Sequence, residues 1–295
     1  MNIEEFVCAN SLGKVLHNQD LRKLLSIKTK GMVRNLILPK DNQALIKIIG
    51  FLGKGHYYLL GNGSNVVFSS NKTVENIIVL KYMDEKFVIN DDLLTVNAGF
   101  ALKKLSYKLA ELAYTNLEFF SGIPGTIGGA IRMNAGCYKQ ETKNYLVSAL
   151  CADQNGEIRN YTNEELKFGY RNSLVKEQNL IVLEAVFKIK KTTEDVMRII
   201  DVWREERVKN QPLDYPNCGS IFKNGVQPAW KMIDQVNLRG HRINDAMFSN
   251  KHASFIINVG DATGEDVRDL IQLAKKRVKE ELDLELSEEI ILLNF

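Results

Sequence analysis

Paired cysteines and clustered histidines are missing from this 295-residue sequence. Its four cysteines lie far apart and form no CxxC pair, which favours buried thiols in a reducing cytosol over a disulfide framework. The histidines show no metal-ligand spacing, so we expect no metal site. The residues concerned are Cys8, Cys137, Cys151, Cys218, His17, His56, His241 and His252.

Long apolar runs and a strong charge imbalance are also missing. No apolar run approaches the roughly 18 residues of a membrane helix, and the acidic start "MNIEEFVCAN" lacks the apolar core of a signal peptide. Lys and Arg total 39 against 36 Asp and Glu, a net charge of +3, and no basic face carries interleaved aromatics. We therefore expect a soluble cytoplasmic protein with neither a nucleic-acid nor a membrane partner.

The pattern of helices and strands predicts an α+β fold. The length suits about two domains. In the first two thirds, strands and helices mix without a regular βαβ alternation, which argues against a doubly wound sheet. The ranges are a helix over 41–52, strands at 56–60 and 76–80, a hairpin over 87–96, a helix over 102–113, a hairpin over 148–161 and a strand over 180–189.

The pattern of predicted elements changes after Lys190, where we place the main domain boundary. A helical apolar stripe begins at Val196 and is followed by a proline-containing loop over 210–220. Further elements are a helix over 230–236, a strand over 253–259 and a helix over 264–282, which opens on a Thr263/Asp266 capping box.

Two glycine-rich segments are the first candidate site. "GNGSN" (Gly61–Asn65) follows a predicted strand, and "SGIPGTIGGAIRMNAGC" (Ser121–Cys137) contains five glycines with short polar residues between them. Bare peptide N–H groups suit phosphate oxygens, so the pair fits an extended ligand such as a dinucleotide. The first segment is not GxGxxG, because Val66 occupies the third glycine position. Two unrelated structural turns are the alternative.

Three short segments carry reactive side chains. Arg171 in "FGYRNS" could pair with a carboxylate or phosphate, although a surface arginine is the simpler interpretation. "NCGSIFKN" places Ser220 after a glycine, close to Lys223 and Asn224. "ELSEEIILL" contains Glu285, Glu288 and Glu289 before an apolar strand, where either a buried acid or a solvated acidic run is possible.

In this order, the segments resemble the UDP-N-acetylenolpyruvoylglucosamine reductases, flavoenzymes of peptidoglycan synthesis. The stretches that match are "GNGSN", "SGIPGTIGGAIRMNAG", "FGYRNS", "NQPL", "GSIFKN", "KHASFIIN" and "EEI", from about Ser26 to the C-terminus. The resemblance implies a vanillyl-alcohol-oxidase-type FAD-binding region of two α+β subdomains, about 21–80 and 81–190. An extension over 1–20 precedes it, and an α+β substrate-binding domain over 191–295 follows it.

The resemblance also implies the site residues, with FAD and NADPH as cofactors, a UDP-sugar enolpyruvate as substrate and a monomer as the working form. The implied catalytic residues are Arg171, Ser220 and Glu289. The implied FAD contacts are Gly61, Asn62, Gly63, Ser64, Asn65, Gly122, Ile123, Pro124, Gly125, Thr126, Gly128, Gly129, Asn134, Ala135 and Gly136. The implied substrate contacts are Tyr170, Arg171, Lys223, Asn224, Lys251 and His252.

The sequence departs from the family pattern at several positions. Lys139 stands where glycine is usual, Gly225 replaces a proline, "KGMV" (Lys30–Val33) replaces a "GGPA"-like stretch, and "EII" (Glu289–Ile291) replaces "EVR". The span 189–217 is too short for the family's extra tyrosine loop, which indicates the compact subtype. Two alternatives remain: a FAD-dependent oxidase of a sugar or alcohol, with Cys137 near a possible flavin tether, or a non-catalytic nucleotide-binding protein.

Overall fold

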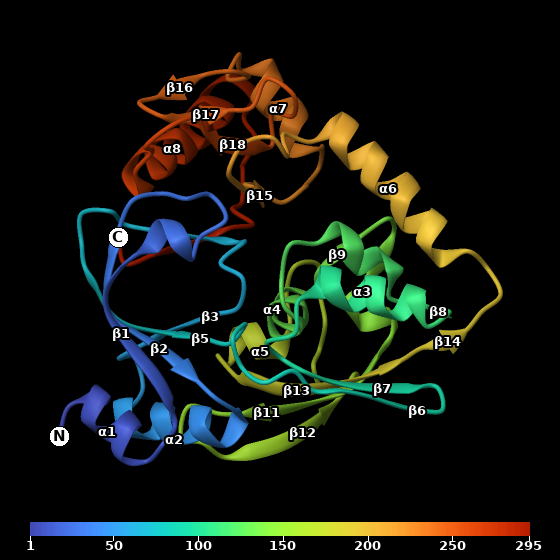
Figure 1. Ribbon diagram of the computed structural model, residues 1–295. Helices are drawn as coiled ribbons and strands as arrows, with labels where there is room; N and C mark the ends of the chain where they lie inside the picture. The colour runs from blue at the N-terminus through green and yellow to red at the C-terminus, as the bar shows by residue number, and fades with distance from the viewer. The chain divides into compact units, whose positions relative to one another are not determined.

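The computed structural model describes all 295 residues and divides the chain into two compact units (Figure 1). The first unit comprises residues 1–17, 35–62 and 75–205, and the second comprises 18–34, 63–74 and 206–295. The chain passes between them within strands β1 (Gly13–Asp20), β2 (Met32–Pro39) and β5 (Val74–Val79), in the loop between Asn62 and Gly63, and within helix α6 (Val196–Asn210). No helix is both long enough and apolar enough to span a bilayer.

A four-stranded sheet in the order β1-β2-β5-β3 includes β3 (Tyr58–Leu60), which is parallel to β5. The helices near the N-terminus are α1 (Ile3–Ala9) and α2 (Asn42–Leu52). Helix α2 begins after Asp41, whose carboxylate accepts a hydrogen bond from the Ala44 N–H at 2.7 Å. Its buried face carries Leu45, Ile48 and Ile49, so the helix predicted over 41–52 is confirmed.

The second sheet of the first unit has the order β12-β11-β13-β7-β6, and all its neighbouring strands are antiparallel. Its strands are β6 (Phe87–Asn90), β7 (Leu93–Asn97), β11 (Leu146–Ala152), β12 (Ile158–Thr162) and β13 (Ile181–Lys188). The predicted hairpins are confirmed and turn at Asp91 (φ 54°) and at Gly156 (φ 88°). Helices α3 (Leu102–Glu111) and α4 (Ile127–Met133) lie on one side of this sheet (Figure 1).

Short elements complete the first unit. They are β8 (Tyr114–Thr115), η2 (Glu118–Gly122), β9 (Gly136–Cys137), β10 (Gln140–Glu141), η3 (Thr142–Asn144), α5 (Leu174–Glu177) and β14 (Lys190–Lys191). Strand β8 pairs with β14, and β9 pairs with β10. The helix predicted over 102–113 ends earlier, at Glu111, because Ala113 takes a left-handed conformation with φ 57°.

The second unit contains a four-stranded antiparallel sheet in the order β15-β18-β17-β16. Its strands are β15 (Asn217–Ser220), β16 (Arg242–Ile243), β17 (Ala246–Phe248) and β18 (Phe255–Asn258). Its helices are η1 (Leu21–Lys23), α7 (Ala229–Gln235) and α8 (Gly264–Leu282). A separate parallel pair joins β4 (Val66–Phe68) to β19 (Ile291–Leu293), so the middle segment of this unit's sequence meets its C-terminal end in one ladder.

Helix α8 follows its sequence prediction at both ends. Thr263 and Asp266 form the predicted capping box, and the apolar stripe from Val267 to Val278 is buried. Gly264 opens the helix against the main chain of β4, since a Cβ there would lie 1.9 Å from the Phe68 carbonyl oxygen. The mixture of antiparallel sheets and covering helices confirms the predicted α+β class.

Candidate active site

The long glycine segment and the start of "GNGSN" meet in the first unit. Thr126 is the N-cap residue of α4, yet its side chain makes no capping bond, and its buried Oγ1 has no hydrogen-bond partner in the protein. A Cβ on Gly61 would lie only 2.2 Å from this Oγ1. Glycine is therefore needed at position 61, where the short loop passes close to the unsatisfied Thr126 hydroxyl of the long one.

Asn134 joins the glycine segment to the turn that contains Arg171. It ends α4 in a left-handed conformation (φ 42°) and is fully buried. Its Nδ2 donates to the Gly169 carbonyl and to Glu141 Oε2, both at 3.0 Å. Its Oδ1 accepts from the Lys143 N–H at 3.1 Å. The amide of this predicted flavin contact thus fixes two neighbouring segments of the protein, the turn at Gly169 and residues 141–143.

Arg171 lies in a tight turn beside the end of the glycine segment. Its backbone is left-handed (φ 54°), between Gly169 and Asn172, which exchange backbone hydrogen bonds. The Arg171 Nη2 donates to the Gly136 carbonyl at 3.3 Å. Its guanidinium carbon lies 5.1 Å from the centre of the Tyr170 ring. The predicted catalytic arginine and the predicted flavin loop are therefore in contact within one unit.

The other predicted FAD contacts belong to different units, because the chain leaves the first unit after Asn62. Gly61 and Asn62 end a segment of the first unit, whereas Gly63, Ser64 and Asn65 belong to the second. The rest of the long segment stays in the first unit: Gly122, Ile123, Pro124, Gly125, Gly128, Gly129, Ala135 and Gly136. Gly63 has φ 61°, and a Cβ there would lie 2.2 Å from the Leu24 carbonyl oxygen, so this position requires glycine.

Asn65 connects "GNGSN" to the C-terminal acidic segment inside the second unit. Its carbonyl accepts from the Ile291 N–H at 3.0 Å, and its Nδ2 donates to the Glu289 carbonyl at 3.1 Å. The Glu289 N–H in turn donates to the Ile221 carbonyl at 2.8 Å. The Asn65 side chain thus holds the main chain at Glu289, which is in turn bonded to the main chain at Ile221, next to Ser220.

Ser220 closes β15 immediately after Gly219, whose φ is 81°. Ser220 pairs with Phe255 across the antiparallel ladder, and its next neighbour Ile221 is the residue that accepts from Glu289. Sequence analysis predicted Ser220 and Glu289 as site residues separately, and the fold brings them onto adjoining main chain. Burial raises the pKa of the nearby Cys218 thiol to about 12, so this cysteine is not a nucleophile.

Glu288 and Glu289 have different environments. The Glu288 carboxylate pairs with Lys275 of α8, with Nζ and Oε1 2.8 Å apart. The backbone of Glu288 forms an isolated antiparallel bridge with Phe222, whereas Glu289 lies between Asn65 and Ile221. The two adjacent glutamates are therefore held by different parts of the second unit, Glu288 by helix α8 and Glu289 by the main chain at Asn65 and Ile221.

The remaining predicted substrate contacts of the second unit lie at turns. The Lys223 N–H donates to the Ser287 carbonyl, and Asn224 Oδ1 accepts from the Ala229 N–H at the start of α7. Lys251 Nζ donates to the Val208 carbonyl at 2.6 Å. His252 Nδ1 lies 3.3 Å from the donating Ser254 N–H, and burial, followed by the positive charge of Arg239, lowers the pKa of His252.

The residues of the two glycine segments fit a ligand rich in hydrogen-bonding oxygens. Thr126 provides a buried hydroxyl that no protein group satisfies. The neighbouring Gly129 is exposed, and a Cβ there would meet nothing closer than Thr126 Oγ1 at 3.6 Å. A FAD pyrophosphate could approach bare main chain at this point without displacing a side chain.

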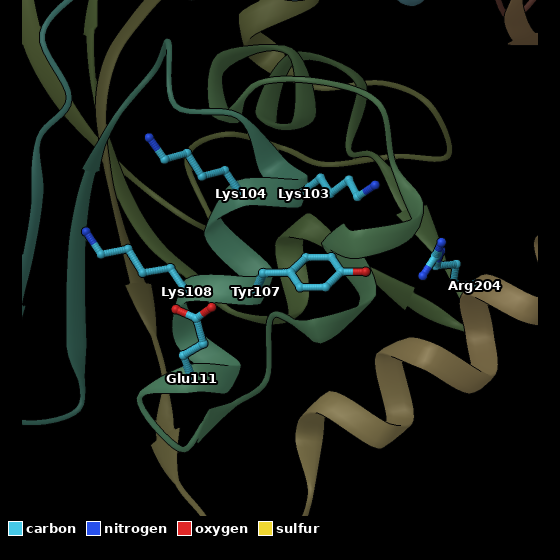
Figure 2. A pocket seen from close by; sticks show the side chains of 6 residues that line it. All are labelled: Lys103, Lys104, Tyr107, Lys108, Glu111 and Arg204. Atoms are coloured by element: carbon cyan, nitrogen blue, oxygen red, sulfur yellow. The ribbon is translucent and has the colours of Figure 1, made fainter.

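A separate groove of about 810 Å³ lies between α3 and α6 on the first unit (Figure 2). It is lined by Lys103, Lys104, Tyr107, Lys108, Glu111 and Arg204, none of which is a predicted site residue. Figure 2 shows the Tyr107 ring extending from α3 towards Arg204 of α6. Lys104 is paired with Glu85, and Lys108 lies 3.9 Å from the centre of the Phe87 ring, so these cations already have partners.

The chain is similar to known proteins over nearly its full length. Residues 33–162 match the family described as FAD binding domain, and residues 211–293 match the family described as UDP-N-acetylenolpyruvoylglucosamine reductase, C-terminal domain. UDP-N-acetylenolpyruvoylglucosamine reductase from Bacillus pumilus is 34% identical over 98% of this chain and 97% of its own length. The enzyme of that name from Staphylococcus aureus is 36% identical, covering 94% and 91%.

A solved structure agrees with these sequence matches. The crystal structure of UDP-N-acetylenolpyruvylglucosamine reductase from Thermus caldophilus has a TM-score of 0.79 and 30% sequence identity, covering 95% of this chain and 99% of its own. The family predicted from the short motifs is therefore confirmed by relatives that span the whole fold. The chain belongs to the UDP-N-acetylenolpyruvoylglucosamine reductase family.

Proposed function

We propose that this chain uses NADPH and FAD to reduce the enolpyruvyl group of UDP-N-acetylglucosamine enolpyruvate, giving UDP-N-acetylmuramate for peptidoglycan synthesis. The observation that carries the proposal is the hydrogen bond from Arg171 to Gly136, because it joins a predicted catalytic cation to the predicted flavin loop. FAD, when bound, supplies the hydride. Gly61, Thr126 and the main chain of 122–129 would hold it, together with the residues of "GNGSN" that follow Gly61.

Arg171 has the charge that the reduction requires. Adding hydride to the terminal carbon of an enolpyruvyl ether moves negative charge onto the adjacent carboxylate, giving an enolate-like species. A guanidinium held by a backbone carbonyl and a tight turn is already oriented when that charge develops. Arg171 therefore stabilises the developing charge without reorganising during the step.

Ser220 is the proton donor in this scheme. The carbon that bears the carboxylate must gain a proton once the terminal carbon has been reduced. Serine is a weak acid, so it suits a strongly basic carbon such as an enolate. Gly219 has no side chain beside the hydroxyl, and the strand pairing with Phe255 fixes the backbone. Lys223 follows three residues later and offers a positive charge to the resulting alkoxide.

Glu289 orients the substrate carboxylate, either through a shared proton or through a bridging group. Its backbone is fixed by Asn65 and Ile221, and its neighbour Glu288 is paired with Lys275. Tyr170, Asn224, Lys251 and His252 are further substrate contacts in this proposal. It also includes a FAD-binding region over 21–190, a substrate domain over 191–295, a cytoplasmic location and a monomeric working form.

An absorption spectrum with two additions tests the proposal. The purified protein should show the bands of oxidised flavin, lose them with NADPH under anaerobic conditions and regain them when the enolpyruvyl substrate is added. A colourless protein that binds nucleotide would favour a non-catalytic role. Bands that NADPH leaves unchanged, with oxygen consumed on addition of a sugar or alcohol, would favour an oxidase. Flavin that stays attached after denaturation would indicate a covalent tether, with Cys137 as the nearest thiol in the sequence.

A further inference from the structure

The β9–β10 hairpin turns through two residues that both have left-handed backbones. Cys137 pairs with Gln140, so Tyr138 and Lys139 form a two-residue loop, with φ 53° and 63°. A hairpin of this kind needs positive φ at both central positions, and asparagine or glycine normally occupies them. Tyrosine and lysine pay a conformational penalty there. Some other contact must therefore hold the turn.

Trp203 of α6 provides that contact. The Tyr138 and Trp203 rings are stacked, with centroids 4.2 Å apart and planes 8° from parallel. The Tyr138 hydroxyl also donates to the Trp203 carbonyl at 2.9 Å. Both residues belong to the first unit. The stack and the hydrogen bond together fix the tip of the hairpin against the helix.

The base of the same hairpin reaches the predicted active site. Gly136 pairs with Glu141 in the β9–β10 ladder, and its carbonyl accepts from Arg171 Nη2. Next to it, the Ala135 carbonyl accepts from both the N–H and the Oγ1 of Thr142. Gly136 therefore lies between the base of the hairpin, which the Ala135–Thr142 bonds fix, and the tip, which is held by the contact with Trp203.

We propose that Tyr138 and Trp203 are positioning residues for Arg171. Their stack holds the hairpin in its left-handed turn, the turn fixes the Gly136 carbonyl, and that carbonyl orients the arginine for the reduction of the enolpyruvyl group. The inference rests on the proposed role of Arg171. Without the stack, Tyr138 and Lys139 relax towards the backbone angles that they prefer, and the arginine loses its fixed acceptor.

Proteolysis of the holoenzyme tests the first step without using activity. Lys139 is exposed at the turn, so trypsin can cleave after it only as fast as the hairpin opens. The release of the peptide ending at Lys139, followed by mass spectrometry, should be about 3- to 10-fold faster in Trp203→Leu, as expected for loss of an aromatic pair. Val202→Ala, on the same helix but at an exposed position, is the matched control and should match the wild type.

Single-turnover kinetics test the second step. Enzyme that has been reduced with NADPH is mixed with the enolpyruvyl substrate, and flavin reoxidation is followed. Trp203→Leu should slow reoxidation by about 3- to 10-fold while leaving flavin content and reduction by NADPH unchanged. Trp203→Phe keeps a ring for stacking and should recover most of the rate. A purely structural weakening would not divide the two half-reactions in this way.

Lys139→Gly provides the rescue. Glycine adopts positive φ at no steric cost, so it should hold the turn without help from the stack. Combined with Trp203→Leu, it should return reoxidation to near the wild-type rate. Alone, it should have little effect, since the turn is already held.

Each result bears on a defined part of the inference. Unchanged cleavage after Lys139 in Trp203→Leu would show that the stack does not hold the turn, and would overturn the proposal. Faster cleavage with an unchanged reoxidation rate would overturn the link to Arg171. Slow reoxidation in the variant that combines Lys139→Gly with Trp203→Leu would show that the turn is not the cause of the lost rate. If wild-type enzyme is not reoxidised by the substrate at all, the proposed function fails, while the cleavage assay still reports whether the stack holds the hairpin.

Discussion

Residues of the predicted site are linked mainly through side chains in the first unit and through the main chain in the second. Asn134 and Arg171 reach the carbonyls of Gly169 and Gly136 with their own amide and guanidinium groups. In the second unit, strand pairing and backbone bonds from Glu289 to Ile221 place Ser220. The effect of a side-chain substitution should therefore reach neighbouring site residues in the first unit. In the second unit, the effect should be confined mainly to the substituted residue.

The largest effect that we expect comes from filling the glycine segment of the first unit. A Cβ on Gly128 would lie 3.2 Å from the Ala98 Cβ, and the Gly128 N–H donates to the Ala98 carbonyl. The two further methyl groups of Gly128→Val need space that this packed position lacks. The variant should purify nearly free of FAD, as measured by the ratio of flavin to protein absorbance. Gly50→Val, where a Cβ meets nothing within 4 Å, is the control. Full flavin content in Gly128→Val would contradict the loop assignment.

The next largest effect tests the second unit. Ser220→Ala should keep its FAD and its NADPH-dependent reduction of an artificial acceptor, but should reduce the enolpyruvyl substrate more slowly by roughly 10²–10⁴-fold, the range for loss of a general acid. Ser220→Cys, with a more acidic group, should recover part of this loss. Flavin content should be unaffected, because the strand is fixed by main-chain bonds. A wild-type single-turnover rate in Ser220→Ala would remove this serine from the mechanism.

Asn134→Ala tests the side-chain network itself. It removes the hydrogen bond to the Gly169 carbonyl, which keeps the Asn172 N–H as a donor, and the one from the Lys143 N–H; each lost hydrogen bond costs about 0.5–1.5 kcal/mol. We expect a lower free energy of unfolding together with slower reoxidation, because the turn around Arg171 loses its anchor. Asn144→Ala removes a more exposed amide from the adjacent turn and should change both quantities less. Equal effects of the two variants would mean that the network does not transmit the change.

The smallest effect concerns pH and the second unit. Burial, followed by the charge of Arg239, lowers the pKa of His252 in the folded protein. The unfolded chain therefore binds a proton first as the pH falls, so this histidine's contribution to stability is lost from about pH 6.5 downwards. His252→Gln should reduce the slope of the melting temperature against pH between pH 7 and pH 5. An identical slope in the variant would assign the acid sensitivity to other groups.

Local sequence patterns determined most of the elements and the family. The capping boxes, the turn glycines and the apolar stripe of α8 depend on residues within a few positions of each other, so the chain itself specifies them. The chemical types at Arg171, Ser220 and Glu289 were also visible, because the motifs around them are short and continuous. The roles of these residues stay predictions.

Only the tertiary structure could show which residues distant in the sequence contact each site residue. The pairing of Glu288 with Lys275, the bond from Asn65 to Glu289 and the stack of Tyr138 on Trp203 join segments 13, 224 and 65 residues apart. No periodicity in the sequence encodes such contacts, since they depend on how strands and helices pack. Lys139 was visible as an unusual residue at a glycine position, but its compensating partner, Trp203, became apparent only when the fold placed α6 beside the hairpin.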